Sequence, residues 1–189
     1  MTRNRLTTAG WLAMASAALT VPWIVLTFSL AGGVGEGVKA AEICLLVSGT
    51  ALLVYLLLTL RRLLQEKFSF RAADGIMALL IKVNIVSAAV SVFGFAVPSL
   101  EGSVGVFGIV MVVLIGILQG MFGFRLLSLP ADLQGLHKPY CYLNIVTGVC
   151  TAVVVLLPLG VVASAVSDVM LGTIFFQAAA ALPRAEEGP

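Results

Sequence analysis

A single charged residue, Asp168, interrupts the otherwise uncharged stretch from Cys141 to Leu182. As one α-helix this stretch would be about 63 Å long at 1.5 Å per residue. That is twice the roughly 30 Å thickness of the hydrocarbon core of a bilayer. The stretch must therefore turn back on itself, and Pro158–Gly160 is the expected break because proline and glycine interrupt helices.

The composition of the rest of the chain supports the same interpretation. Hydrophobic residues make up 60% of the 189 residues and charged residues only 11%, with a mean hydropathy of +1.12. Backbone groups in hydrocarbon must form their hydrogen bonds within the segment, which favours helices. We therefore predict an all-α, polytopic membrane helix bundle that forms a single transmembrane domain over residues 1–189, surrounded by the lipid bilayer, with no room for a soluble catalytic domain.

Six apolar segments bounded by charge, glycine or proline are the expected membrane spans. They cover about residues 8–31, 40–60, 76–97, 104–124, 141–158 and 161–182. The first could be a cleaved signal peptide, but its apolar stretch from Trp11 to Leu30 exceeds the roughly 7–15 residues of such signals, so a retained helix is preferred. Between the fourth and fifth spans, about residues 128–136 are expected to form a short amphipathic helix in the inner interface or a simple connector.

The basic residues give the expected orientation. Nine of the 11 lysines and arginines fall on one side of a six-span topology: Arg3, Arg5, Arg61, Arg62, Lys67, Arg71, Arg125, Lys138 and Arg184. The loops on the opposite side carry only Lys39. Under the positive-inside rule this asymmetry predicts a plasma (inner) membrane protein with both termini in the cytoplasm.

The first, third and fifth spans share pairs of hydroxyl residues four positions apart. The pairs are Ser16 with Thr20, Ser87 with Ser91 and Thr147 with Thr151, and Asn84 and Asn144 precede the last two pairs by three residues. On a helix these positions form one polar stripe. The pattern indicates either three tandem two-helix hairpins inserted in the same direction or ordinary polar contacts between packed membrane helices.

Two ionisable residues, Lys82 and Asp168, fall well inside predicted spans. Such a group costs roughly 2.5–3.5 kcal/mol to insert near the membrane centre, so it usually has a function or a partner. Three interpretations stay open: an ion or proton path, a buried salt bridge between the two, or a Lys82 side chain that reaches the cytoplasmic interface. Asp168 shares a small-residue face with Gly160, Ser164 and Gly172, which we expect to pack against another helix.

Three uncharged residues, Asn84, Asn144 and Gln119, complete the candidate intramembrane site. The asparagines belong to the polar stripes, and Gln119 is a candidate hydrogen-bond partner for another helix. Glycines form an expected close-packing face on the same span as Gln119, at Gly108, Gly116 and Gly120.

The sequence contains no motif for catalysis. It lacks metalloprotease, serine hydrolase and phosphate-binding signatures. Its one histidine, His137, provides no pair of haem ligands, and Cys44, Cys141 and Cys150 form no Cys-x-x-Cys pair and are expected to be buried thiols. We therefore expect no enzyme activity, no cofactor and no metal site, and the net charge of +2 gives no indication of a nucleic-acid partner.

Two classes of function remain. The preferred class is a non-enzymatic accessory or scaffolding membrane subunit, because a single bundle of 189 residues has little room for a solute cavity. The alternative is a translocator of small solutes, ions or protons that uses Lys82 and Asp168. Besides lipid, the expected partners are a second copy of the chain or another membrane protein.

Overall fold

The computed structural model is all-helical, as the sequence predicts, and it describes residues 2–30, 36–97, 101–129 and 135–182. The helices are α1 (Arg3–Leu30), α2 (Glu36–Phe68), α3 (Asp74–Ala96), α4 (Glu101–Leu126), α5 (His137–Ala152) and α6 (Leu157–Ala180), with a short 3-10 turn, η2 (Val154–Leu156), before α6.

Four stretches of helix in the described residues are long and apolar enough to cross a membrane. They are Ala40–Phe68, Asp74–Gly94, Gly102–Leu126 and Val154–Ala180. Their outward faces carry exposed aliphatic side chains such as Val106, Ile117 and Val162. Four helices of this kind fit a membrane-embedded protein. Of the other two, α1 has 28 residues, and α5 has 16, which at 1.5 Å per residue is about 24 Å.

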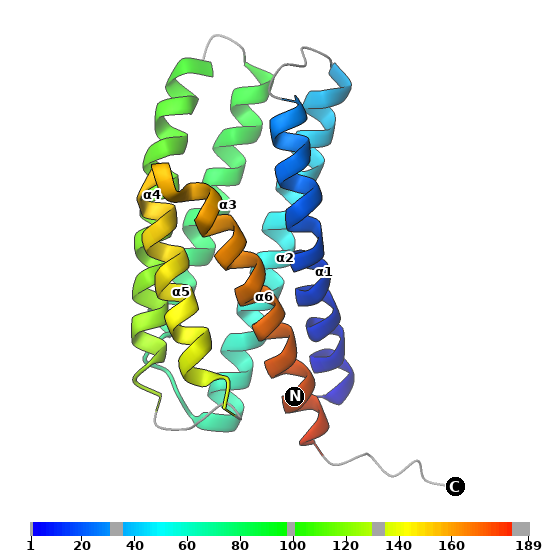
Figure 1. Ribbon diagram of the computed structural model, residues 1–189, viewed down its shortest axis with the longest axis vertical. Coiled ribbons are helices and arrows are strands. Elements are labelled where there is room, and N and C mark those ends of the chain that lie inside the picture. The colour runs from blue at the N-terminus through cyan, green and yellow to red at the C-terminus, as the bar shows by residue number, and fades with distance from the viewer. Residues whose placement is uncertain (1, 31–35, 98–100, 130–134, 183–189) are drawn as a thin grey trace, which may run out of the picture.

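The helices form a ring in chain order (Figure 1). Each helix contacts the next one along the chain, and α6 closes the ring against α1. Across the described ranges, the Cα atoms of α-helices on opposite sides of the ring do not come within 8 Å of one another. α1 begins and α6 ends at the same end of the bundle, which we call the terminal end.

The packed core lies toward the terminal end of the ring. Its buried residues are Leu6, Ala9, Ala13, Leu56, Leu60, Leu63, Leu64, Ala73, Met77, Phe122, Leu126, Leu129, Tyr140, Cys141, Leu171, Ile174, Phe175, Ala178 and Ala179. The first buried residue along α2 is Leu56, and the first along α4 is Gly116. The far halves of these two helices therefore surround a less densely packed part of the bundle.

The chain reverses between α5 and α6 earlier than the sequence suggested. α5 ends at Ala152 and α6 begins at Leu157, so Pro158 lies in the first turn of α6. The expected break at Pro158–Gly160 is therefore wrong, because a proline in the first helical turn lacks only an N–H that would have no partner in the helix. In Figure 1 this reversal lies well below the upper ends of α3 and α4, so α5 and α6 do not reach the far end of the ring.

The connection between α4 and α5 is described only in part. The expected interfacial helix at about 128–136 falls largely on residues 130–134, which lie outside the described residues. Before that segment Leu126 and Leu129 are buried in the core, and after it Gly135 has a φ of 84°, a left-handed conformation that suits glycine.

Glycines bring α4 and α5 into backbone contact. A Cβ atom added to Gly148 would clash with the backbone nitrogen of Gly120 and would lie 2.6 Å from the carbonyl oxygen of Gly116. The predicted close-packing face of the fourth span is therefore used at Gly116, where an added Cβ would lie 2.7 Å from the carbonyl oxygen of Gly148. The backbone of Gly120 lies close to Gly148, but an added Cβ at Gly120 itself would have nothing within 4 Å. At Gly108 an added Cβ would have nothing within 4 Å.

This close contact predicts that Gly148→Ala lowers the stability of the protein. Because the new methyl group would meet rigid backbone of α4, we expect a loss of about 1–3 kcal/mol, the usual cost of overpacking. The matched control is Gly108→Ala, which adds the same methyl group on α4 where there is room. Thermal unfolding in detergent measures both, and equal melting temperatures for the two variants would contradict the contact.

Candidate functional site

A cavity of about 450 Å³ lies inside the ring and is lined by residues from all six helices. Leu56, Phe122, Tyr140 and Leu171 belong both to its lining and to the packed core, so the core forms its floor toward the terminal end. The volume falls within the roughly 300–1,000 Å³ that small-molecule sites occupy in proteins.

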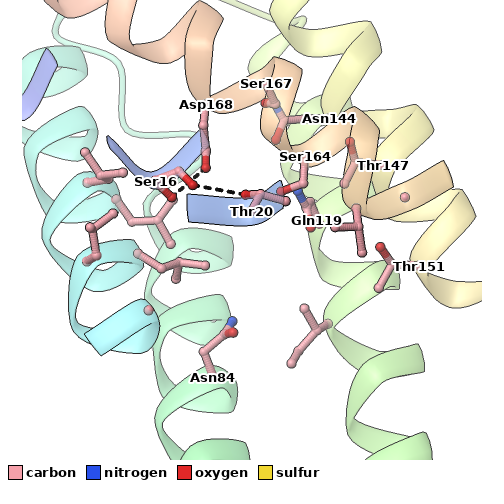
Figure 2. A pocket seen from close by; sticks show the side chains of 18 of the residues that line it. Ser16, Thr20, Asn84, Gln119, Asn144, Thr147, Thr151, Ser164, Ser167 and Asp168 are labelled. Carbon is pink, nitrogen blue, oxygen red and sulfur yellow. Dashed lines mark hydrogen bonds between the residues drawn. The ribbon is translucent and has the colours of Figure 1, made fainter. Parts of the chain in front are cut away.

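Polar side chains from every helix line this cavity, and Figure 2 shows most of them. They are Ser16 and Thr20 of α1, Ser48 of α2, Asn84 of α3, Gln119 of α4, Tyr140, Asn144, Thr147 and Thr151 of α5, and Ser164, Ser167 and Asp168 of α6. Four residues of the candidate site, Asn84, Gln119, Asn144 and Asp168, are therefore brought together around one space.

The polar stripes of the odd-numbered helices converge on the cavity unequally. α1 contributes its hydroxyl pair and α5 contributes its whole stripe. On α3 the stripe reaches the cavity only through Asn84, while Ser91 donates a hydrogen bond to the carbonyl oxygen of Ser87 at 2.9 Å. The three helices thus place polar groups in a common centre, although they are not equivalent in detail.

The carboxylate of Asp168 joins α6 to α1. The hydroxyl of Ser16 donates a hydrogen bond to Oδ2 of Asp168 at 2.7 Å (Figure 2). The predicted small-residue face of α6 continues on both sides of this contact, because Gly172 lies against the carbonyl oxygen of Gly10 and Gly160 lies against Thr151. The face therefore packs against α1 at one end and α5 at the other, with the carboxylate between them.

The amide of Asn144 joins α5 to α6. Its Nδ2 donates to the carbonyl oxygen of Tyr140 at 2.9 Å and to the hydroxyl oxygen of Ser167 at 3.1 Å. The amide of Asn84 instead donates within its own helix, to the carbonyl oxygen of Leu80 at 2.8 Å. Only Asn144 of the two therefore makes an interhelical hydrogen bond.

Several polar groups of the lining, among them the hydroxyls of Thr151 and Ser164, have no hydrogen-bond partner within the described part of the chain. The side chain of Thr147 is 1% exposed and its hydroxyl is unsatisfied. The amide of Gln119 likewise makes no hydrogen bond among these residues, although it was expected to bond to another helix. An unsatisfied buried polar group costs about 1–3 kcal/mol. Among the described residues the hydroxyl of Thr147 and the Oε1 of Gln177, which lies outside the lining, are such groups, whereas Gln119 is half-buried at the cavity.

Lys82 does not belong to this cavity. Its side chain is exposed and is not part of the lining, and the described residues contain no ion pair between Lys82 and Asp168. The reason is helical geometry: Asn84, two residues later, faces the cavity, and positions two apart lie about 200° apart around a helix. The structure therefore does not bring the two charged residues together, and a Lys82 side chain that reaches the cytoplasmic interface stays a prediction.

Some lining residues were not singled out from the sequence. Tyr140 lies four residues before Asn144, so it extends the polar stripe of α5 by one turn, and this spacing is a signal that could have identified it. Ser48 and Ser167 offered no such pattern.

The cysteines lie outside the cavity lining. Cys141 is buried, Cys150 is only partly buried and Cys44 is exposed, so the expectation of three buried thiols is confirmed for Cys141 alone. Over the described ranges, no three histidine, cysteine or acidic residues lie close enough together to hold a metal ion.

Comparisons with protein-family models, with curated proteins and with solved structures find no match to this chain. Its function is therefore argued from the geometry and chemistry of the cavity.

The contact between Ser16 and Asp168 predicts that the two side chains are energetically coupled. In a double-mutant cycle, Ser16→Ala and Asp168→Asn should show an interaction energy of about 0.5–3 kcal/mol, as residues in contact do. Lys82→Met and Asp168→Asn should instead be additive to within about 0.5 kcal/mol. Unfolding in mixed detergent gives the free energies, and a large coupling for the Lys82 pair would overturn this assignment of partners.

Proposed function

We propose that this protein is a non-enzymatic membrane protein whose six helices all lie in the bilayer, and whose central cavity holds a small polar solute and passes it across the membrane. The observation that carries the proposal is the cavity itself: about 450 Å³, lined by all six helices and containing Asp168. Burying polar groups is unfavourable in an apolar bundle, so twelve polar side chains gathered in one place are expected to have a use.

The sequence favoured an accessory subunit because a single bundle of this length was expected to have little room for a solute. A cavity within a single copy of the chain removes that reason, and it also means that the proposed function needs no second subunit. The translocator proposed here uses Asp168 and the uncharged lining, without Lys82.

The proposed topology places the terminal end in the cytoplasm. The described lysines and arginines at that end are among the nine basic residues that predicted a cytoplasmic location. One of them, Arg61, forms an ion pair with Asp74 at 3.2 Å. α1 is long enough to span and α5 is shorter than the hydrocarbon core, so α5 would enter from the cytoplasmic side and turn within the membrane. The apolar turn at Val153–Leu156 suits that depth.

This topology predicts which positions react from the same side. Ser69→Cys and Ser128→Cys lie at exposed positions at the terminal end, whereas Gly102→Cys lies at the opposite end. An impermeant maleimide added to intact cells should label only the Gly102→Cys variant, and added to inverted vesicles it should label the other two. Labelling of Ser69→Cys and Ser128→Cys from different sides would refute the proposed topology.

Solute access predicts that cysteines in the cavity react with water-soluble reagents. The test uses a chain whose native cysteines are replaced (Cys44→Ser, Cys141→Ala, Cys150→Ala) and which carries either Ser164→Cys, in the cavity, or Val146→Cys, on the outer face of α5. A cationic methanethiosulfonate reagent should modify Ser164→Cys at least tenfold faster, because Val146→Cys would face lipid.

The side of the membrane to which the reagent is added shows from where a solute can enter the cavity. Because the packed core closes the cavity toward the terminal end, we expect reaction in proteoliposomes mainly from the opposite side. If Ser164→Cys reacts no faster than Val146→Cys from either side, the cavity is dry and the proposed function is wrong.

A further inference from the structure

We infer that the solute accepted by this cavity is a small amphiphilic organic cation, with an ammonium group at Asp168 and an apolar body in the rest of the space. The inference rests on the proposed function and specifies the chemical class of its solute.

The charge of the lining selects a cation. Asp168 is the one carboxylate among the lining residues, and no lysine, arginine or histidine lies in the lining. Of the carboxylate oxygens, Oδ2 accepts the hydrogen bond from Ser16, and no described cation pairs with the group. A carboxylate in a bundle of apolar helices favours a positively charged ligand and disfavours an anion, because opposite charges attract strongly where water is scarce.

The two sides of the cavity differ in polarity. α2 contributes five leucines, Leu45, Leu52, Leu53, Leu56 and Leu57. On the opposite side of the ring, every lining residue of α5 is polar. A ligand with an apolar body and a polar, hydrogen-bonding head would satisfy both surfaces, whereas a hydrated metal cation or a sugar would leave the leucines facing polar groups.

An unpartnered amide supplies a second acceptor for the head. The side chain of Gln119 is half-buried, and its amide oxygen accepts no hydrogen bond among the described residues. Gln119 belongs to the same lining as Asp168, so a primary ammonium group with three N–H donors has a carboxylate and a neutral oxygen available to it.

The size of the cavity distinguishes this ligand from a proton or a bare ion. About 450 Å³ is in the range used for drug-like and metabolite-sized ligands. A proton path needs only a chain of polar groups, so it would not require a space of this volume beside a wall of leucines.

The test compares three compounds that share a phenyl body and differ in charge: 2-phenylethylammonium, 2-phenylethanol and phenylacetate. Calorimetry of the full chain in phosphatidylcholine nanodiscs, with empty nanodiscs subtracted, should show binding of the ammonium compound at least tenfold tighter than the alcohol and no measurable binding of phenylacetate. Asp168→Asn should abolish the preference for the ammonium compound over the alcohol. Glu42→Gln, which removes an acid outside the cavity lining, should leave the preference unchanged.

A second measurement keeps Asp168 intact, in case its substitution prevents folding. In the Ser164→Cys variant, 2-phenylethylammonium should slow methanethiosulfonate modification at concentrations at which 2-phenylethanol does not. If the cation and the alcohol protect equally, or neither protects, the cation assignment is overturned while a reactive Ser164→Cys still supports a solute cavity. If Ser164→Cys is unreactive without any compound, the proposed function itself has failed.

Discussion

Polar groups inside an apolar bundle must be matched by one another, by water or by a ligand, and this requirement governs the centre of the ring. Some matches are internal: Ser16 bonds Asp168, and Asn144 bonds Ser167. Each of these pairs joins α6 to one of its two neighbours. The hydrogen bonds that satisfy the buried groups therefore also hold α6 in place, while the half-buried amide of Gln119 is left without a partner among the described residues in the cavity lining.

Close backbone packing and the open centre depend on each other. Gly116 and Gly148 let α4 and α5 approach more closely than a side chain at either position would allow. Between α1 and α6, Gly172 leaves room for the carbonyl oxygen of Gly10, and Gly10 leaves room for the ring of Phe176. With α5 and α6 fixed against their outer neighbours in this way, the ring stays wide enough for a space between them. The leucines and aromatic residues near the terminal end fill that space only on one side.

The helical fold and much of the lining could be predicted from the sequence. A long apolar run in hydrocarbon satisfies its backbone hydrogen bonds by forming a helix. The stripe of Asn144, Thr147 and Thr151 follows helical spacing. Lys82 was assigned to the site by its depth alone. Its direction around α3 also mattered, and Asn84 two residues later already implied that the two point to opposite sides. The early reversal before Pro158 and the central cavity depend on how the helices pack together, and no local sequence pattern predicts that.

The packed layer beneath the cavity has an electrical consequence. Water-filled space carries little of the voltage across a membrane, whereas a dry layer such as that around Leu56, Phe122, Tyr140 and Leu171 carries most of it. In the proposed orientation, a monovalent cation that leaves Asp168 for the cytoplasm would cross nearly the whole potential, a gain of about 2.3 kcal/mol for each 100 mV of inside-negative voltage. A short hydrophobic barrier would thus let the resting potential of the cell pull the solute inward without a second coupled ion.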